Sequence, residues 1–333
     1  MKLASLKEGG RDGTLVVVNR ELSRAVKVPD IASTLQQALE NWDRAAPALA
    51  GVYEALNTAG DGPVSGREAF AVDFTALASP LPRAYEFVDG SAYLPHVERV
   101  RRARGAEVPE SFYTDPLMYQ ATSAGFLGPR DPVVVPSEDF GIDLEAEVVV
   151  ITDDVPMAVT AEEAAGHIQL IGLVNDVSLR NLIPGELAKG FGFLQSKPRS
   201  ALSPVFVTPD ELGATWIDSK LHRPLLTHVN GEWFGAPEAG VDMQFNFAQL
   251  VAHVARTRPL ASGTIVGSGT VATQATSLGA SCFAEKRTVE TLETGKPITP
   301  FMKYGDVVRI EMLDAEGRSI FGAIEQTIAP LAR

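Results

Sequence analysis

The sequence contains a single cysteine, Cys282, among 333 residues. One cysteine excludes an internal disulfide framework and fits a reducing compartment, so we expect a cytoplasmic protein. No apolar run reaches the roughly 18 residues that a membrane helix needs, and the first ten residues lack the apolar segment of a signal peptide. Basic residues are outnumbered, 29 Lys and Arg against 42 Asp and Glu, which gives a net charge of -13. This charge argues against nucleic acid or an anionic membrane as a partner and is compatible with binding a cation.

The first part of the chain combines one strand with helical segments. An apolar run at residues 15–18 predicts a strand, and apolar spacing predicts a helix from about residue 35, with Ser33 as its cap. A second helix is expected over residues 47–59, with Pro47 in its first turn. Turn-rich sequence follows, so we predict a small N-terminal domain over residues 1–78.

Strand-like runs dominate the remainder. They cover residues 133–135, 145–151, 170–178, 205–207, 225–229, 307–312 and 319–324. Two helices interrupt them: Thr160 and Glu163 form a capping box at the start of one, and Asn246 is the candidate cap of the other, which carries an apolar stripe. Few helices and many strands between Gly and Pro predict an α+β fold that is mostly β and mostly antiparallel, with a second, larger domain over residues 79–333.

Acidic residues occupy positions where a buried strand would carry apolar side chains. Glu145 and Glu147 point to the same face, because side chains alternate along a strand. A second apolar run ends in Asp176. Buried carboxylates need a partner, and a hard divalent cation accepts several of them. We therefore predict a metal site and an enzyme. The alternatives are a solvated acidic strand face and a turn-forming Asp176.

Several segments together have the order and spacing of a known family. Asp89 lies seven residues before His96, and Glu145-x-Glu147, Asn175-Asp176-Val177-Ser178-Leu179-Arg180 and the segment Gly263–Thr270 follow. This pattern resembles the fumarylacetoacetate hydrolase family over residues 80–330. The resemblance implies a mixed β-sandwich or β-roll catalytic domain after a small N-terminal domain. It also implies Mg²⁺ or Ca²⁺, with Mn²⁺ as a further candidate, bound by Asp89, Glu145, Glu147 and Asp176. Asp143 would share a strand face with Glu145 and Glu147, but it lies at the entrance of the strand and is not included among the ligands.

The same resemblance implies the catalytic groups. His96 would act as general base on a water molecule, assisted by Glu285, because a neutral imidazole has a pKa near operating pH. Lys197 would stabilise developing negative charge. Arg180 lies four residues after Asp176, so on a strand it would share that face. The residues expected to contact the substrate are Arg180, Tyr119 and Thr264.

The implied reaction is metal-dependent hydrolysis of a carbon–carbon bond in a β-diketo acid. The example is fumarylacetoacetate, split into fumarate and acetoacetate in tyrosine breakdown. The expected partner is this small molecule, and the resemblance implies a homodimer. The alternatives are a hydratase, decarboxylase or isomerase of 2-oxo acids in the same superfamily, or a non-catalytic divalent-cation-binding protein. A mononuclear iron oxygenase is disfavoured, because no second histidine lies at matching spacing.

Other conspicuous residues receive structural interpretations. The basic run Arg99, Arg101, Arg102 and Arg104 predicts a solvated helix face, one member of which could reach a substrate carboxylate. Gly263, Gly267 and Gly269 lack the spacing of a dinucleotide loop, and tight turns beside the site are the expected role. Cys282 is expected to be a buried, inert thiol.

Overall fold

The structure is a computed structural model that describes residues 1–60, 62–103 and 107–332. Its strands are β1 (Lys2–Leu6), β2 (Thr14–Val18), β3 (Arg24–Lys27), β4 (Ala69–Ala71), β5 (Phe87–Gly90), β6 (Met118–Gln120), β7 (Val133–Val135), β8 (Ile142–Asp143), β9 (Ala146–Thr152), β10 (Ile168–Asn175), β11 (Ser178–Leu179), β12 (Ala201–Leu202), β13 (Phe206–Val207), β14 (Trp216–Ile217), β15 (Lys220–Leu221), β16 (Leu226–Val229), β17 (Glu232–Gly235), β18 (Ile265–Gly267), β19 (Val307–Glu311) and β20 (Ile324–Pro330). Its α-helices are α1 (Leu35–Leu39), α2 (Trp42–Thr58), α3 (Leu94–Ala103), α4 (Ala161–Ala165), α5 (Ile183–Leu187), α6 (Pro209–Leu212), α7 (Phe247–Val254) and α8 (Phe283–Thr294). Short 3₁₀ turns lie at Glu110–Tyr113, Glu138–Phe140, Gly213–Thr215 and Thr276–Leu278.

Two sheets form the framework of the molecule. The larger, of 11 strands, has the order β4-β3-β2-β1-β13-β10-β9-β18-β5-β6, with β12 paired to β10. The smaller, of five strands, has the order β17-β16-β19-β20-β7. Most neighbours are antiparallel, while β18–β5 and β20–β7 are parallel. Across the described residues neither sheet closes on itself, and the predicted α+β class is confirmed.

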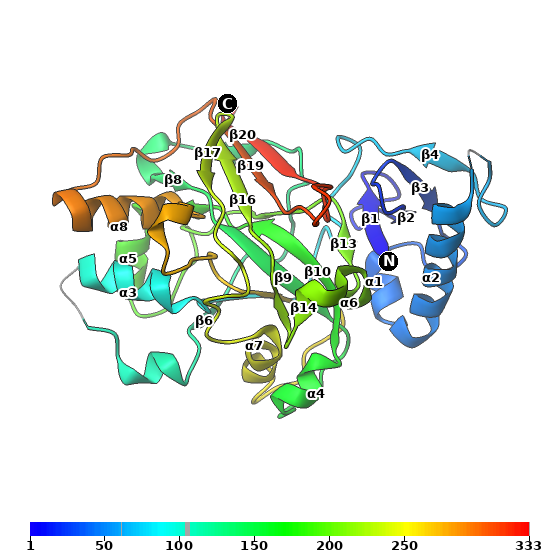
Figure 1. Ribbon diagram of the computed structural model, residues 1–333, viewed down its shortest axis with the longest axis horizontal. Helices are drawn as coiled ribbons and strands as arrows, with labels where there is room; N and C mark the ends of the chain where they lie inside the picture. Colours follow the sequence, from blue (N-terminus) through cyan, green and yellow to red (C-terminus); the bar gives the residue numbers. More distant parts are fainter. Residues whose placement is uncertain (61, 104–106, 333) are drawn as a thin grey trace.

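The N-terminal strands join the large sheet directly. Figure 1 shows β1 to β4 with α1 and α2 as the blue part of the molecule, beside the larger remainder. Antiparallel pairing of β1 with β13 connects the two, with Lys2 opposite Val207. Because the sheet continues through this pairing, the domain boundary after residue 78 stays a prediction.

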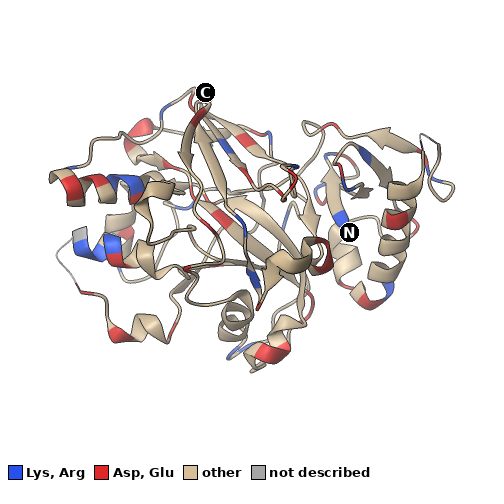
Figure 2. Cartoon of the chain, in the orientation of Figure 1, with Lys and Arg blue, Asp and Glu red and all other residues tan. Residues whose placement is uncertain are grey.

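Charged side chains occur on both parts of the molecule, and acidic ones are conspicuous on several helices (Figure 2). Among the described residues, none of the helices combines the length and the apolar character needed to cross a membrane.

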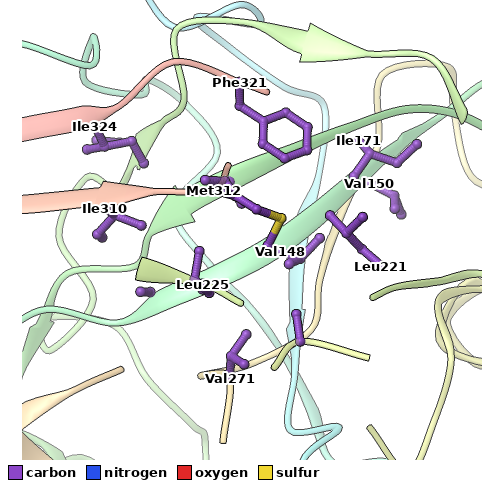
Figure 3. Packing of buried hydrophobic residues seen from close by; sticks show 14 of the residues in the cluster. Val148, Val150, Ile171, Leu221, Leu225, Val271, Ile310, Met312, Phe321 and Ile324 are labelled. Atoms are coloured by element: carbon purple, nitrogen blue, oxygen red, sulfur yellow. The ribbon is translucent and has the colours of Figure 1, made fainter. Parts of the chain in front are cut away.

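The large sheet is buried on both faces. Val148 and Val150 of β9 pack into a cluster that includes Met312 and Phe321 (Figure 3). The intervening residues of β9 pack into a second cluster that includes side chains of α1 and α2. Strands covered on both faces are continuously apolar rather than alternating. A charged side chain within β9 is therefore buried whichever face it occupies.

Two of the predicted helix starts are confirmed and two are wrong. The capping box predicted at Thr160 is present before α4, and Asn246 caps α7 as predicted, where it also forms a capping box. The cap of α1 is Thr34 rather than Ser33, because the Thr34 hydroxyl accepts the amide of Gln37. The second helix begins at Trp42, so Pro47 lies inside it rather than in its first turn.

The strand predicted over residues 319–324 is wrong. A turn closed by the amide of Asp314 on the carbonyl of Arg318, at 2.8 Å, precedes this segment. Strand β20 begins only at Ile324. The apolar pattern of residues 319–324 reflects burial of Ile320 and Phe321 in the core, which does not require a strand.

Candidate metal and catalytic site

Three buried carboxylates meet because their strands are neighbours in the large sheet. Asp89 lies on β5 and Glu147 on β9, with β18 between these two strands. Asp176 directly follows β10, which pairs with β9 on its other side. One oxygen from each of the three residues lies within 4.8 Å of the others. Sheet pairing thus assembles a group that is dispersed in the sequence.

Gly267 of β18 has no side chain, and this leaves room for the carboxylate group. A Cβ at this position would lie 2.2 Å from Asp89 Oδ1 and 3.4 Å from Glu147 Oε2. Gly263 and Gly269 have left-handed φ angles, +90° and +78°, as turns require. The turn role predicted for Gly267 is therefore replaced by a close approach of carboxylates. The amide of Gly269 donates to Asp89 Oδ1 at 3.1 Å.

The electrostatics of the three carboxylates suit a divalent cation. Neither oxygen of Glu147 has a hydrogen-bond partner among the described residues, although both are buried. Burial, followed by the charge of Asp176, raises the pKa of Asp89 to about 7. Burial, followed by Asp89, raises the pKa of Glu147 well above its usual value. Such oxygens need a compensating cation when ionised, so Asp89, Glu147 and Asp176 could hold a metal ion.

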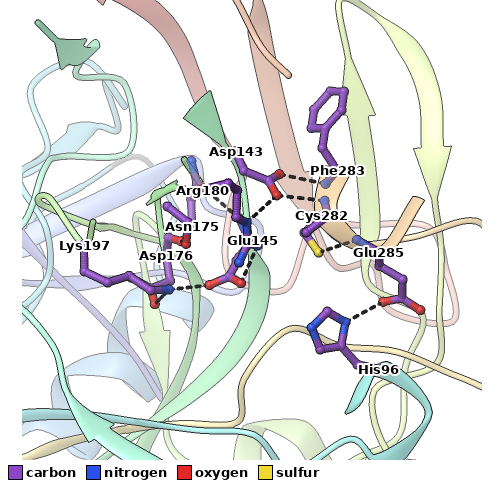
Figure 4. A network of polar contacts seen from close by, with 12 residues as sticks. His96, Asp143, Glu145, Asn175, Asp176, Arg180, Lys197, Cys282, Phe283 and Glu285 are labelled. Atoms are coloured by element: carbon purple, nitrogen blue, oxygen red, sulfur yellow. Dashed lines mark hydrogen bonds and ion pairs between the residues drawn. The ribbon is translucent and has the colours of Figure 1, made fainter. Parts of the chain in front are cut away.

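Glu145, the fourth predicted ligand, is not a member of this group. Figure 4 shows its carboxylate beside Arg180 and Lys197. Its Oε1 accepts from Arg180 Nη2 at 2.6 Å, and its Oε2 accepts from Lys197 Nζ at 2.6 Å. Although burial alone would raise it, these two cations lower the pKa of Glu145. The strand predicted through Glu145 is interrupted between β8 and β9, so simple alternation does not place its side chain.

Lys197 connects Glu145 to the carboxylate group. Its Nζ lies 2.7 Å from Asp176 Oδ2, and the side chain is 5% exposed. Although burial favours the neutral amine, Asp176 and Glu145 raise the pKa of Lys197, which remains an ammonium. Tyr119 donates to the same Asp176 oxygen at 2.5 Å, and burial raises its pKa. Lys197 and Tyr119 are therefore both donors at neutral pH.

Asp143 anchors Arg180 and was not anticipated as part of the site. Arg180 Nε donates to Asp143 Oδ2 at 2.8 Å. Asp143 is fully buried and also accepts the amides of Phe283, at 2.7 Å, and Ala284, at 2.8 Å, at the start of α8. Pairing of Ser178 with Asp143 brings Arg180 here, rather than a shared strand face with Asp176. The sequence did contain one signal for Asp143: it lies two residues before Glu145 and four before Glu147, which on a continuous strand would place all three on one face.

His96 and Glu285 meet between α3 and α8. His96 Nδ1 lies 3.3 Å from Glu285 Oε2. Arg99, on the next turn of α3, forms an ion pair with Glu285 Oε1 and donates to the carbonyl of Thr273 at 2.5 Å. The interpretation of Arg99 as a solvated residue is wrong, because its side chain is only 12% exposed. Arg104, from the same basic run, lies outside the described residues.

Thr264 is not brought to the carboxylates. It precedes Gly267 by three residues, roughly 10 Å along an extended chain, and its hydroxyl donates to the carbonyl of Ala261 at 2.8 Å. The predicted substrate contact of Thr264 thus gains no support from its position. Thr270 directly follows Gly269, whose amide donates to Asp89 Oδ1.

Family models cover nearly all of the chain. One described as the C-terminal domain of fumarylacetoacetate (FAA) hydrolase matches residues 86–329. Another, described as fumarylacetoacetase N-terminal domain 2, matches residues 1–83. The chain belongs to the fumarylacetoacetate hydrolase family. The family implied by the sequence pattern is thereby confirmed.

Curated relatives of this fumarylacetoacetate hydrolase family member differ in their reactions. The chain is 31% identical over 160 residues to 2,4-didehydro-3-deoxy-L-rhamnonate hydrolase of Sphingomonas sp. (strain SKA58), covering 47% of this chain and 53% of the relative. It is 24% identical over 172 residues to a mitochondrial oxaloacetate tautomerase of Bos taurus, covering 51% of each. The chain thus spans about half the length of the curated relatives that it matches.

Solved structures share the fold over the whole chain. Fumarylacetoacetate hydrolase from psychrophilic Exiguobacterium antarcticum has a TM-score of 0.67 at 18% identity, covering 99% of this chain and 100% of that one. Maleylpyruvate hydrolase from Sphingobium sp. SYK-6, in complex with manganese(II) and pyruvate, has a TM-score of 0.65 at 14% identity, with full coverage of both chains. At such low identity, the likeness to these structures shows the fold of this family member and nothing more.

Proposed function

We propose that this protein hydrolyses a carbon–carbon bond of a β-diketo acid, as in the conversion of fumarylacetoacetate to fumarate and acetoacetate in tyrosine breakdown. The observation that carries the proposal is a continuous network. Lys197 and Glu145 link the carboxylate group to Arg180, and Asp143 links Arg180 to α8, which bears Glu285. A non-catalytic cation site would not need a histidine–carboxylate pair connected to it through such a network.

His96 is positioned to take a proton from water. Its Nδ1 faces the carboxylate of Glu285, which favours the tautomer with the proton on Nδ1 and leaves Nε2 as acceptor. Arg99 holds the other oxygen of Glu285, which restricts the orientation of this carboxylate. The side chain of His96 is 18% exposed, so water can reach it.

Lys197 and Tyr119 supply positive charge and hydrogen-bond donors where an oxyanion develops. Mg²⁺ or Ca²⁺, with Mn²⁺ as a further candidate, would be held by Asp89, Glu147 and Asp176, and would supply Lewis-acid polarisation of a substrate carbonyl. Lys197 remains charged through the reaction because its carboxylate partners raise its pKa.

In the proposed reaction, His96 takes one proton from water and later returns it to the product. The oxygen of water bonds to a carbonyl carbon of the diketo acid, while Nε2 takes the proton. The carbon–carbon bond then breaks, and its electron pair passes to the neighbouring carbon as an enolate. The imidazolium returns the proton to that carbon, which yields two carboxylic acids and regenerates the base.

The proposal is tested by ultraviolet detection of fumarylacetoacetate loss with added Mg²⁺. His96→Ala should lower kcat by at least roughly 100-fold, while calorimetry still detects Mg²⁺ binding. His253→Ala, which removes a histidine from α7, is the matched control and should retain activity. Full activity of His96→Ala would overturn the mechanism.

A second candidate is suggested by the tautomerase relative. Isomerisation of a 2-oxo acid would move a proton without adding water. Keto–enol interconversion of oxaloacetate, followed in the ultraviolet, would favour this reaction if it proceeds while fumarylacetoacetate remains intact.

We further propose a cytoplasmic homodimer that binds no nucleic acid. Support for the dimer comes from Phe191 and Leu194, which are 98% and 80% exposed near α5. Large exposed apolar side chains are typical of association surfaces. Light scattering after size exclusion should give twice the 35.5 kDa chain mass, and a Phe191→Ser, Leu194→Ser variant should be monomeric.

A further inference from the structure

A cavity of about 310 Å³ adjoins His96 on the side of α8. It lies between α3, α5 and α8, which Figure 1 shows grouped at one end of the molecule. His96 and Val100 line it from α3, and Ile183 lines it from α5. Arg287 and Thr288 line it from α8, together with Phe301. The cavity thus begins at the proposed base and extends between partly apolar walls.

The charged residues that line this cavity are arginines, in contrast to the acidic balance of the protein as a whole. Arg180 and Arg287 are among its residues, and the described part of the chain contributes no Asp or Glu to it. The protein carries a net charge of -13. A pocket lined by cations within an acidic protein attracts an anionic group selectively.

Among the described residues Arg287 has no acidic partner, unlike Arg180. Arg180 binds two carboxylates, whereas no carboxylate in the described residues lies within 4.0 Å of Arg287. The Arg287 guanidinium donates to the carbonyl of Thr299 and stacks 4.3 Å from the ring centre of Phe301. Glu290, one turn further along α8, accepts the amides of Ile298 and Thr299.

We infer that this cavity binds the acyl end of the substrate and that Arg287 recognises a carboxylate at the far end of that acyl group. The inference rests on the proposed function. A guanidinium matches a carboxylate with two parallel hydrogen bonds, and Val100, Ile183 and Phe301 offer apolar contacts to the carbons between. The volume is at the lower end for small-molecule pockets, which suits a short chain. We therefore assign to Arg287 the selection of substrates whose acyl group ends in a carboxylate over those whose acyl group does not.

The test compares two substrates that differ at this end. Fumarylacetoacetate carries a carboxylate on its acyl group, whereas 3,5-dioxohexanoate has an acetyl group in its place. Arg287→Met should lower kcat/KM for fumarylacetoacetate roughly 10- to 100-fold, the effect of one charge-assisted hydrogen-bonding group, and leave 3,5-dioxohexanoate unchanged. Arg287→Lys should restore part of the loss.

The control variant is Lys286→Met, at the adjacent position of α8. It removes the same charge from a side chain that stacks on Phe234, outside the cavity lining. We expect it to behave as the wild type with both substrates. Equal effects of Arg287→Met on both substrates, or no effect on either, would overturn the inference and leave the proposed hydrolysis intact.

A direct binding measurement tests the role of Arg287 independently of catalysis. Calorimetry with fumarate and Mg²⁺ should show binding to the wild type that Arg287→Met weakens about tenfold. If the wild type cleaves neither substrate but binds fumarate through Arg287, the proposed function fails and the cavity assignment stands. Fumarate binding that is absent, or equal in both proteins, would overturn the assignment.

Discussion

At the scale of single residues, the protons on Asp89 and Glu147 make metal binding depend on pH. Burial and neighbouring carboxylates raise both pKa values, that of Asp89 to about 7. Unfolding returns these groups to ordinary pKa values near 4. The unfolding free energy of the metal-free protein therefore falls as pH rises from about 4 to about 7. We expect the Tm in EDTA to decrease over this window and the stabilisation by Mg²⁺ to increase.

Calorimetric Mg²⁺ titration in two buffers of different ionisation enthalpy measures the protons displaced. At about pH 6 the wild type should release more protons per ion than Glu147→Gln, which has no proton to lose at this position. Equal release from both proteins would contradict the assignment of a protonated Glu147.

Asp143 should be the most sensitive of the carboxylates for stability. It is fully buried, and it accepts Arg180 and two amides of α8. Asp143→Ala leaves the guanidinium with one partner fewer, so we expect the free energy of unfolding to fall by about 3 kcal/mol. Urea denaturation with Mg²⁺ present measures this change.

The matched control is Asp139→Ala, four residues earlier, at an exposed position. An exposed substitution should change stability by less than about 0.5 kcal/mol. A comparable loss in both variants would show that Asp143 has no special anchoring role.

At the scale of elements, Glu186 of α5 organises the segment that leads to Lys197. Its carboxylate accepts the amides of Leu194, Gln195 and Ser196 and the Ser196 hydroxyl. Although burial alone would raise it, these donors lower the pKa of Glu186 to about 2. Its stabilising effect is thus complete above about pH 4.5 and is lost as pH falls toward about 2.

Glu186→Gln should loosen this segment at neutral pH, because an amide oxygen accepts these donors more weakly than a carboxylate. We expect hydrogen exchange of the amides of residues 194–196 to accelerate about tenfold, with lower activity through displacement of Lys197. Glu162→Gln, at an exposed position on α4, is the control. Unchanged exchange in Glu186→Gln would refute the role of this carboxylate.

Local signals predicted elements where the deciding interaction is itself local. The capping boxes at Thr160 and Asn246 each close within four residues, so the sequence is sufficient to recognise them. The wrong strand over residues 319–324 shows the converse. Burial of Ile320 and Phe321 depends on packing against distant elements, and an apolar pattern does not distinguish a buried loop from a strand.

At the scale of the whole molecule, Lys2 lies where the N-terminal strands join the rest. Its side chain is 3% exposed, and Nζ donates to the carbonyl of Ile320 at 2.8 Å. Burial lowers the pKa of Lys2 to about 8. The folded state holds this proton less tightly than the unfolded chain, so this residue contributes stability that increases as pH rises from about 8 to about 10.5.

Lys2→Met should therefore be more stable than the wild type at neutral pH. Its advantage should shrink by about 3 kcal/mol toward pH 10.5, at about 1.4 kcal/mol per pKa unit. Urea denaturation across this range measures the difference, and Lys189→Met, at an exposed position, should show no such trend. A constant offset between Lys2→Met and wild type would contradict the buried ammonium.

By itself, the sequence determined the family, the α+β class and the residue types of the site. Spacing within short segments carries this information, as in Glu145-x-Glu147 and the Asn175-Asp176 motif. Only the tertiary structure decided which of these carboxylates meet. Asp89 and Glu147 converge because β18 lies between their strands with a glycine at the crossing, whereas Glu145 faces two cations. Strand order depends on pairing between distant segments, and periodicity along one strand does not contain it.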